Sequence, residues 1–346
     1  MWTTRKRYFL HIGLVLFGCF IALALAEGFV RVFYPDSRDH VFPGLLEIDH
    51  NLGWRLQAGE SALHHSTYFA VTYSINARGY RDKAREPSKP VDVYRILLYG
   101  DSQVFGWGIP ADQRFSNVIE NQLPSLEIWN LAVVGYGLDQ EILAYEENGQ
   151  SFQADEVIFF ASKPILSRTH HDYIYKKYKP KFVMEQNGNL RVIPIPQEAY
   201  TLTRFLYNVF GFLYLPHFVE RRQMMPEDAP QNSDVAQRSE SREEGVTITQ
   251  LEKSLLERAR NVALERKHRL TVLAALPDMA KKDLQLFCEQ KGLHFLAIEL
   301  NEDDSEFLLG RYDRHWNIRA HQLIVSQLLP YFRKAQPAAL AAPAPY

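Results

Sequence analysis

The stretch RILLYGDSQVFGWG, residues 95–108, joins an apolar run to a glycine, an acid and a hydroxyl. RILLY has the continuous apolar character of a strand buried on both faces. Gly100 allows a tight departure from such a strand, and the small residues around Ser102 let a substrate approach the backbone. A serine at this turn can also offer its own N–H to a developing oxyanion. The same letters fit an ordinary capped turn, so the stretch needs partners elsewhere.

Four further apolar runs predict companion strands. They are residues 128–134, 156–160, 269–276 and 294–300. Helical candidates lie near residues 114–123, 139–149, 250–267, 279–291 and 319–333. Apolar strands that alternate with helices indicate an α/β fold with a central parallel sheet. Ligands of such sheets bind beyond the carboxyl ends of the strands, which is where Ser102 is expected.

The composition excludes several classes of protein. The formal charge of −2 over 346 residues creates no field that would favour nucleic acid. Cys19 lies in an N-terminal apolar segment and Cys288 in a predicted helix, and no CxxC or Cys/His ligand spacing occurs. The sequence therefore predicts no disulfide, no metal site and no cofactor.

The N-terminus predicts a membrane anchor. The basic residues RKR at 5–7 precede an apolar segment, residues 8–26, that is long enough to cross a bilayer as a helix. A basic flank on this side predicts a cytoplasmic stub at residues 1–7 and export of the rest. Ala24-Leu25-Ala26 also fits a signal-peptidase site, so a cleaved signal is the alternative.

The sequence after the predicted anchor divides into an extension, a main domain with an insert, and a tail. Residues 27–90 are expected to be an extension that packs on a main domain of residues 91–335. An insert at about 165–248 interrupts that domain. It contains a predicted hairpin turning near Asn187-Gly188, an aromatic helix candidate at 203–225 that packs on the domain, lines a groove or touches the membrane, and a polar, flexible loop at about 226–245. The low-complexity tail, 336–346, is predicted to be disordered.

Two more segments carry candidate chemistry. In NLAVVGYGLDQE, residues 130–141, Gly135 can present a bare N–H to the same oxyanion, although a plain strand-to-helix turn has the same pattern. In RYDRHWNIRAH, residues 311–321, Asp313 and His315 are two apart and share a side of an extended loop. Histidine suits removal of a serine proton, and an acid can hold its tautomer.

Together the three segments resemble the GDSL/SGNH hydrolase family over residues 95 to 333, and LGWRL and SINARGYRD upstream resemble its membrane-anchored bacterial branch. The resemblance implies a flavodoxin-like three-layer sandwich preceded by one transmembrane helix. It implies that Ser102 is the nucleophile, His315 the general base and Asp313 its orienting partner, with the N–H groups of Ser102 and Gly135 in the oxyanion hole. It places the domain on the periplasmic side of the inner membrane.

Two departures from the family pattern stand out. Many members carry Asp-x-x-His, whereas Tyr312 stands three residues before His315 here. The third oxyanion donor of the family, an asparagine, is replaced by Lys163-Pro164, and proline has no N–H. Losing one such donor costs about 3–4 kcal/mol in the transition state. Either Ser162 or Lys163 substitutes, or the enzyme is slow, or the site only binds.

Other residues near these segments are candidates for substrate contact. They are Asp101, Gln103, His170, His171 and Trp316. The adjacent histidines follow the third strand, near the expected mouth of the cleft, and their side chains diverge, which argues against a metal site.

The function expected from the resemblance is an exported, membrane-anchored serine esterase acting on acyl esters, such as O-acetyl esters, of glycans or lipids. The alternatives are an O-acyltransferase for an exported polysaccharide and a binding or scaffold protein of the same fold. Nucleotide binding is disfavoured because Gly106 and Gly108 do not build a G-x-G-x-x-G motif and no Walker lysine follows.

Overall fold

The computed structural model describes residues 2–34, 42–210, 213–215, 219, 247–301, 303–311 and 313–335. The loop expected at 226–245 and the tail expected at 336–346 lie outside the described residues. The elements before the insert are α1 (Trp2–Phe33), β1 (Leu46–Asp49), β2 (Gly53–Leu56), β3 (Ser61–His65), β4 (Ala70–Ser74), β5 (Tyr94–Tyr99), α2 (Ser102–Phe105), η2 (Ala111–Gln113), α3 (Phe115–Gln122), β6 (Leu126–Asn130), α4 (Leu138–Asn148), η3 (Gly149–Phe152) and β7 (Glu156–Ser162). The later elements are α5 (Lys163–Thr169), β8 (Tyr173–Ile174), β9 (Lys177–Tyr178), β10 (Lys181–Met184), β11 (Leu190–Ile193), α6 (Gln197–Phe210), α9 (Gln250–Arg266), β12 (Arg269–Ala275), α10 (Asp278–Lys291), β13 (His294–Ala297), η4 (Ser305–Phe307), β14 (Leu308–Gly310), β15 (Asp313–Trp316) and α11 (Ile318–Ala335).

The centre of the domain is a parallel sheet of five strands in the order β13-β12-β7-β5-β6. Each strand overlaps one of the five apolar runs, although β6 ends at Asn130, within the run 128–134, and β13 ends at Ala297, within the run 294–300. All seven residues of β7 are buried, as a strand covered on both faces requires. The chain leaves β5 toward β6 and leaves β7 toward β12, so the direction of the connections reverses between the neighbours β5 and β7. A ligand site is expected beyond the carboxyl ends of the strands at such a point.

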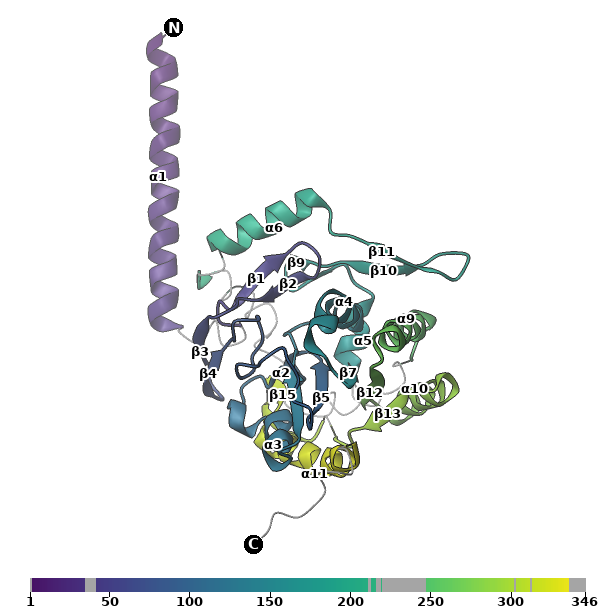
Figure 1. The fold of residues 1–346 in the computed structure, drawn as a ribbon. Helices are drawn as coiled ribbons and strands as arrows, with labels where there is room; N and C mark the ends of the chain where they lie inside the picture. The colour runs from purple at the N-terminus through teal and green to yellow at the C-terminus, as the bar shows by residue number, and fades with distance from the viewer. Residues whose placement is uncertain are drawn as a thin grey trace.

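Helices cover both faces of this sheet (Figure 1). On one face α3 packs against α11, and on the other α4 packs against α9. The direction of each crossover explains the division, because right-handed connections place the helix after β5 opposite the helices that follow β6, β7 and β12. The expectation of a flavodoxin-like three-layer α/β sandwich is confirmed.

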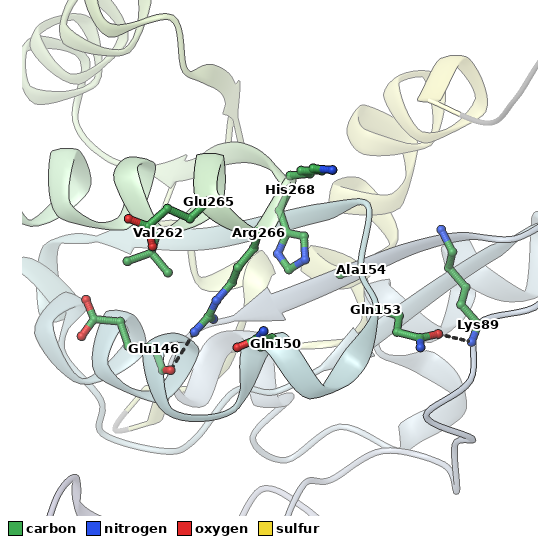
Figure 2. A pocket seen from close by; sticks show the side chains of 10 residues that line it. Lys89, Glu146, Gln150, Gln153, Ala154, Val262, Glu265, Arg266 and His268 are labelled. Atoms are coloured by element: carbon green, nitrogen blue, oxygen red, sulfur yellow. Dashed lines mark hydrogen bonds between the residues drawn. The ribbon is translucent and has the colours of Figure 1, made fainter.

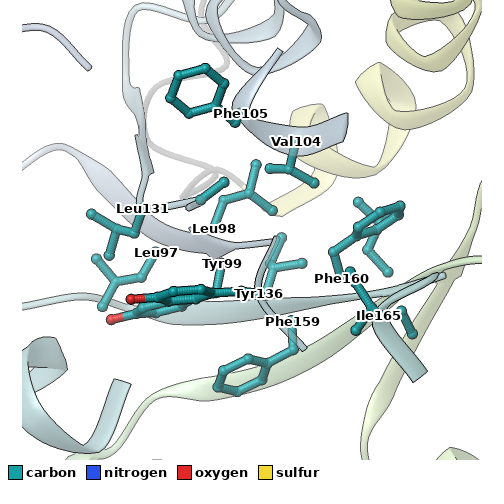
Figure 3. Packing of buried hydrophobic residues seen from close by; sticks show 14 of the residues in the cluster. Leu97, Leu98, Tyr99, Val104, Phe105, Leu131, Tyr136, Phe159, Phe160 and Ile165 are labelled. Atoms are coloured by element: carbon teal, nitrogen blue, oxygen red, sulfur yellow. The ribbon is translucent and has the colours of Figure 1, made fainter. Parts of the chain in front are cut away.

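The core between the layers is rich in aromatic side chains (Figure 3). Tyr99 of β5 stacks on Phe159 of β7 at a centroid distance of 5.6 Å. Phe105 of α2 belongs to the same buried cluster. Burial of each such side chain stabilises the fold by about 1.5–3 kcal/mol. This packing fixes the ends of β5 and β7 relative to α2.

The segment before the sheet forms two antiparallel hairpins, β1–β2 and β3–β4. Trp54 of β2 and Tyr73 of β4 are buried in the same cluster as the central strands. The Trp54 indole N–H donates to the carbonyl of Val134, 2.9 Å away, which fixes the loop after β6. The extension therefore contributes directly to the edge of the sheet where Ser102 lies.

Helix α1 projects away from the domain (Figure 1). Its segment Arg7–Phe33 is long and apolar enough to cross a membrane, and none of its most apolar window is buried against the protein. A signal sequence can have the same length and apolar composition.

The insert begins within α5, and its described residues then form the strand pairs β8–β9 and β10–β11 and the helix α6. β10 and β11 form the predicted hairpin, and Gly188 in its turn has a φ of +83°. The helix expected from residue 203 begins earlier, at Gln197. Pro196 precedes it, and its carbonyl accepts the first hydrogen bond of the helix from Tyr200 N–H at 2.9 Å.

Candidate active site

The nucleophile candidate lies at the start of a short helix after β5. Asp101 caps α2, with its Oδ1 accepting a hydrogen bond from Gln103 N–H at 3.0 Å. A Cβ at Gly100 would lie 2.5 Å from Val104, so only glycine fits this close turn. Ser102 is 7% exposed, with its hydroxyl at the carboxyl edge of the sheet.

His315 and Asp313 meet Ser102 from the other end of the chain. His315 Nε2 lies 2.8 Å from Ser102 Oγ, and its Nδ1 lies 2.7 Å from Asp313 Oδ1. The two residues sit in β15, a strand rather than the expected loop, paired with β14. Residues two apart on a strand point to one face, which explains the Asp-x-His spacing.

Trp107 fixes both members of this pair. Its indole N–H donates to Asp313 Oδ2 at 3.1 Å, and its ring stacks on the His315 imidazole at a centroid distance of 4.7 Å. Burial alone would raise the pKa of Asp313, but the hydrogen bonds and charge of His315, with the Trp107 N–H, outweigh burial and lower that pKa. Asp313 is therefore a carboxylate at neutral pH and can stabilise a protonated His315.

Gly135 lies in the turn that follows β6. Leu131 N–H donates to Leu98 carbonyl at 2.8 Å, and Val133 N–H donates to Gly100 carbonyl at 3.0 Å, so this turn lies alongside the end of β5. Gly135 has a φ of +82°, the left-handed region that favours glycine. Within the described part of the chain, neither its N–H nor that of Ser102 has a hydrogen-bond acceptor.

The two candidate replacements for the third donor follow β7. Ser162 is its last residue, is buried, and its hydroxyl accepts a hydrogen bond from Ile165 N–H at 3.5 Å. Lys163 is the first, half-buried residue of α5. Both lie at the same edge of the sheet as Ser102, because β5 and β7 are parallel neighbours. A role for either in the oxyanion hole stays a prediction.

Arg168 of α5 connects the segments that surround the site. Its Nη1 donates to Asp101 Oδ2 at 2.9 Å and to the Tyr136 carbonyl at 2.8 Å. Its Nε donates to Tyr175 Oη at 3.2 Å. Burial would lower the Arg168 pKa, but the Asp101 charge outweighs it, so the guanidinium stays charged. Arg168 therefore connects the turn that holds Ser102 to the turn that holds Gly135.

Glu141 lies beside this ion pair. It is fully buried, and burial together with the Asp101 charge raises its pKa well above the ordinary value. A neutral Glu141 leaves the negative charge of Asp101 balanced by Arg168.

The structure corrects two of the expected substrate contacts. Asp101 is buried, and its carboxylate is occupied by Gln103 N–H and Arg168, so it supports the turn from behind. Trp316 is 1% exposed and packs edge-on against Phe160 in the core, because residue 316 alternates with His315 on β15.

Gln103 lies at the site, but both polar atoms of its side-chain amide bind the backbone of β15. Its Oε1 accepts from Trp316 N–H at 2.9 Å and its Nε2 donates to the Arg314 carbonyl at 3.4 Å, which holds β15 against α2. His170 instead contacts Glu252 of α9 at 2.6 Å, and His171 is exposed after α5. Among the described residues, neither histidine contacts Ser102, His315 or Asp313. The same described residues contain no cluster of three or more His, Cys, Asp or Glu side chains that could hold a metal.

A cavity of about 700 Å³ lies elsewhere (Figure 2). Its lining includes Arg266 and His268, which precede β12, and Ala154, which precedes β7. These positions mark the amino ends of the strands, opposite the edge that carries Ser102. The cavity is therefore not part of the candidate active site.

No family model matches the sequence, and no curated protein matches it. Thirty-one solved chains match. A lipolytic protein of the G-D-S-L family from Veillonella parvula is 11% identical, with a TM-score of 0.37 over 70% of this chain and 100% of its own. The psychrotrophic esterase EstA from Pseudoalteromonas is 9% identical, with a TM-score of 0.38 over 70% and 97%. A putative acylhydrolase from Bacteroides fragilis is 8% identical, with a TM-score of 0.39 over 73% and 92%. At these scores the functional conclusion rests on the geometry of the site.

Proposed function

We propose that this protein is a serine ester hydrolase of the GDSL/SGNH type. One observation carries the proposal: Ser102 Oγ, the two ring nitrogens of His315 and Asp313 Oδ1 form a continuous chain of contacts of 2.8 and 2.7 Å. A serine, a histidine and a carboxylate in this order and at these distances suit nucleophilic acyl transfer. The two N–H groups without acceptors supply the oxyanion side.

The reaction follows from this geometry. Ser102 Oγ attacks the ester carbonyl carbon while His315 Nε2 takes the hydroxyl proton. The carbonyl electron pair moves to oxygen, which the N–H groups of Ser102 and Gly135 stabilise. Collapse of the intermediate expels the alcohol, which receives the proton from His315. Water then attacks the acyl-enzyme by the same route, releasing the carboxylic acid and restoring Ser102.

The proposal includes the place of the reaction. Helix α1 anchors the domain, and the basic residues ahead of it favour a cytoplasmic N-terminus. The domain then faces the periplasmic side of the inner membrane. Acyl esters of exported glycans or of lipids, O-acetyl esters among them, are the proposed substrates in that compartment.

Hydrolysis of short-chain p-nitrophenyl esters tests the activity. Wild type is expected to release nitrophenol, and Ser102→Ala is expected to lose at least about 10⁴-fold in rate. Ser167→Ala, an exposed serine of α5, is the matched control and is expected to keep the wild-type rate. Equal inactivity of folded wild type and Ser102→Ala would instead favour a binding protein of the same fold.

A further inference from the structure

Helix α6 presents large apolar side chains to solvent. Leu202, Phe205 and Leu206 are 56%, 58% and 44% exposed. Residues three and four apart lie on one side of a helix, so they form a continuous stripe. The opposite side faces the domain, where Thr203 is buried and the Tyr200 ring contacts His50 at a centroid distance of 5.3 Å. The domain itself therefore leaves the stripe uncovered.

The chain that follows α6 binds the base of α1. Tyr214 and Leu215 N–H groups both donate to the Glu27 carboxylate, with distances of 2.9 to 3.1 Å. The Arg31 guanidinium lies 4.8 Å from the centre of the Tyr214 ring. Glu27 and Arg31 are the first charged residues after the apolar segment 8–26, so they mark where α1 leaves a hydrocarbon layer.

The contact places α6 at the level of the membrane boundary. α6 runs crosswise to α1 (Figure 1). Most of the domain lies on the side of α6 that faces away from the N-terminal end of α1. Only residues 35–41 separate Tyr34 from Phe42, which stacks on the core residue Tyr73. A fully extended chain of this length reaches about 28 Å. The domain is thus confined to the surface of any bilayer that α1 crosses.

We propose that α6 lies in the bilayer interface, with Leu202, Phe205 and Leu206 inserted among the acyl chains of the leaflet in which α1 ends. The exposed polar residues Arg204 and Asn208 lie between the stripe and the side that faces the domain, and they face the headgroups and water. Helices with one apolar and one polar face bind bilayers in this way. The inference rests on the proposed anchoring by α1 and not on the hydrolase activity.

Spin labels on the full-length protein test the inference. The protein is reconstituted into vesicles of phosphatidylethanolamine and phosphatidylglycerol, and each nitroxide's collisions with oxygen and with a water-soluble nickel chelate are measured. The native Cys19 of α1 reports on anchoring, because Cys288 is buried and its thiol pKa is raised to about 12. In a Cys19→Ser background, Leu206→Cys reports on the stripe and Asn208→Cys on the polar side.

The expected result is a ratio of oxygen to nickel collisions several-fold higher at position 206 than at position 208, with position 19 deep in lipid. Equal ratios at 206 and 208, with Cys19 in lipid, would overturn the inference while leaving the anchor in place. Spin–spin broadening at 206 that disappears on dilution with unlabelled protein would show a second copy on the stripe, and would also overturn it. A Cys19 label in water would overturn the anchoring and this inference together. Ester hydrolysis by Leu206→Cys at the wild-type rate separates all these outcomes from the proposed activity.

Discussion

The two sides of the candidate site are held in different ways. On the proton-transfer side, Ser102, His315 and Asp313 contact one another directly, and Trp107 holds the last two. On the proposed oxyanion side, the candidate donors are backbone N–H groups whose positions depend on the turn at Gly135 and on Arg168 outside it. Substitutions on the proton-transfer side should therefore remove a chemical step. Substitutions on the proposed oxyanion side should lower the rate by smaller factors.

Asp313→Asn should have the largest effect of the variants that keep the nucleophile. An asparagine cannot stabilise the imidazolium and can hold the wrong tautomer of His315, so kcat should fall about 10³- to 10⁴-fold. In wild type the lowered pKa of Asp313 keeps its carboxylate charged from pH 5 to 9. Rates measured over this pH range check the loss. The control Asp303→Asn, on the exposed surface, should be unchanged, and a loss below tenfold in Asp313→Asn would place the acid elsewhere.

Gly135→Ala probes the oxyanion side with a matched partner. A Cβ at Gly135, where φ is +82°, would lie 3.1 Å from the Tyr175 ring, so the turn should shift and displace its N–H. Displacement short of full loss should lower kcat about 10- to 100-fold. Gly188→Ala strains an equivalent φ of +83° in open space on the β10–β11 hairpin and should leave kcat unaltered. Equal rates in the two variants would remove Gly135 from the mechanism.

Arg168→Met should act through positioning. The variant keeps the stem of the side chain but frees Asp101 and the Tyr136 carbonyl, and we expect kcat for a small soluble ester to fall about tenfold with KM nearly unchanged. Arg168→Lys, which can still pair with Asp101, should recover part of the rate. Arg191→Met removes an exposed ion pair and serves as the control. A lowered unfolding temperature with unaltered kcat would make Arg168 a structural brace only.

His321→Asn should affect stability rather than rate, because His321 touches neither side of the site. Burial, with the nearby Arg114 and Arg81, lowers its pKa to about 3, and its Nδ1 accepts from Phe115 N–H at 3.2 Å. Below the unfolded pKa, about 6.5, the unfolded chain binds a proton that the folded one does not, so the stability falls by up to about 1.4 kcal/mol per pH unit on the way to pH 3. Asparagine keeps a hydrogen-bond acceptor for Phe115 N–H, but its side chain does not titrate in this pH range. Urea midpoints from pH 7 to 4 should therefore decline less steeply in the variant, and identical slopes would contradict this assignment.

The sheet was predictable because its strands are buried on both faces. Runs such as residues 156–160 are continuous and apolar, and the helices between them have their own periodicity. The succession of strands and helices along the chain therefore followed from the residues. The start of α6 at Gln197 was harder to predict, because the apolar pattern becomes clear only from residue 203 onward.

The candidate site was predictable where its spacing is local. Asp-x-His on an extended segment brings Asp313 and His315 to one face whatever the rest of the chain does. The roles of Trp107 and Arg168 were not, because each depends on a partner far along the chain: Asp313 for Trp107 and Asp101 for Arg168. Trp316 was misassigned for the same kind of reason, since only the pairing of β15 decides which of its faces meets the core.

Labelling by a fluorophosphonate probe, followed by mass spectrometry of the modified peptide, tests the central claim most directly. The probe forms a bond to a serine oxygen only where a base takes the proton and an oxyanion site accepts the phosphoryl oxygen. Wild-type protein is predicted to carry one adduct, on Ser102, and His315→Ala to carry almost none. An unlabelled wild-type protein that is folded, or an adduct on a different serine, would contradict the assignment of Ser102 and His315 as an activated pair.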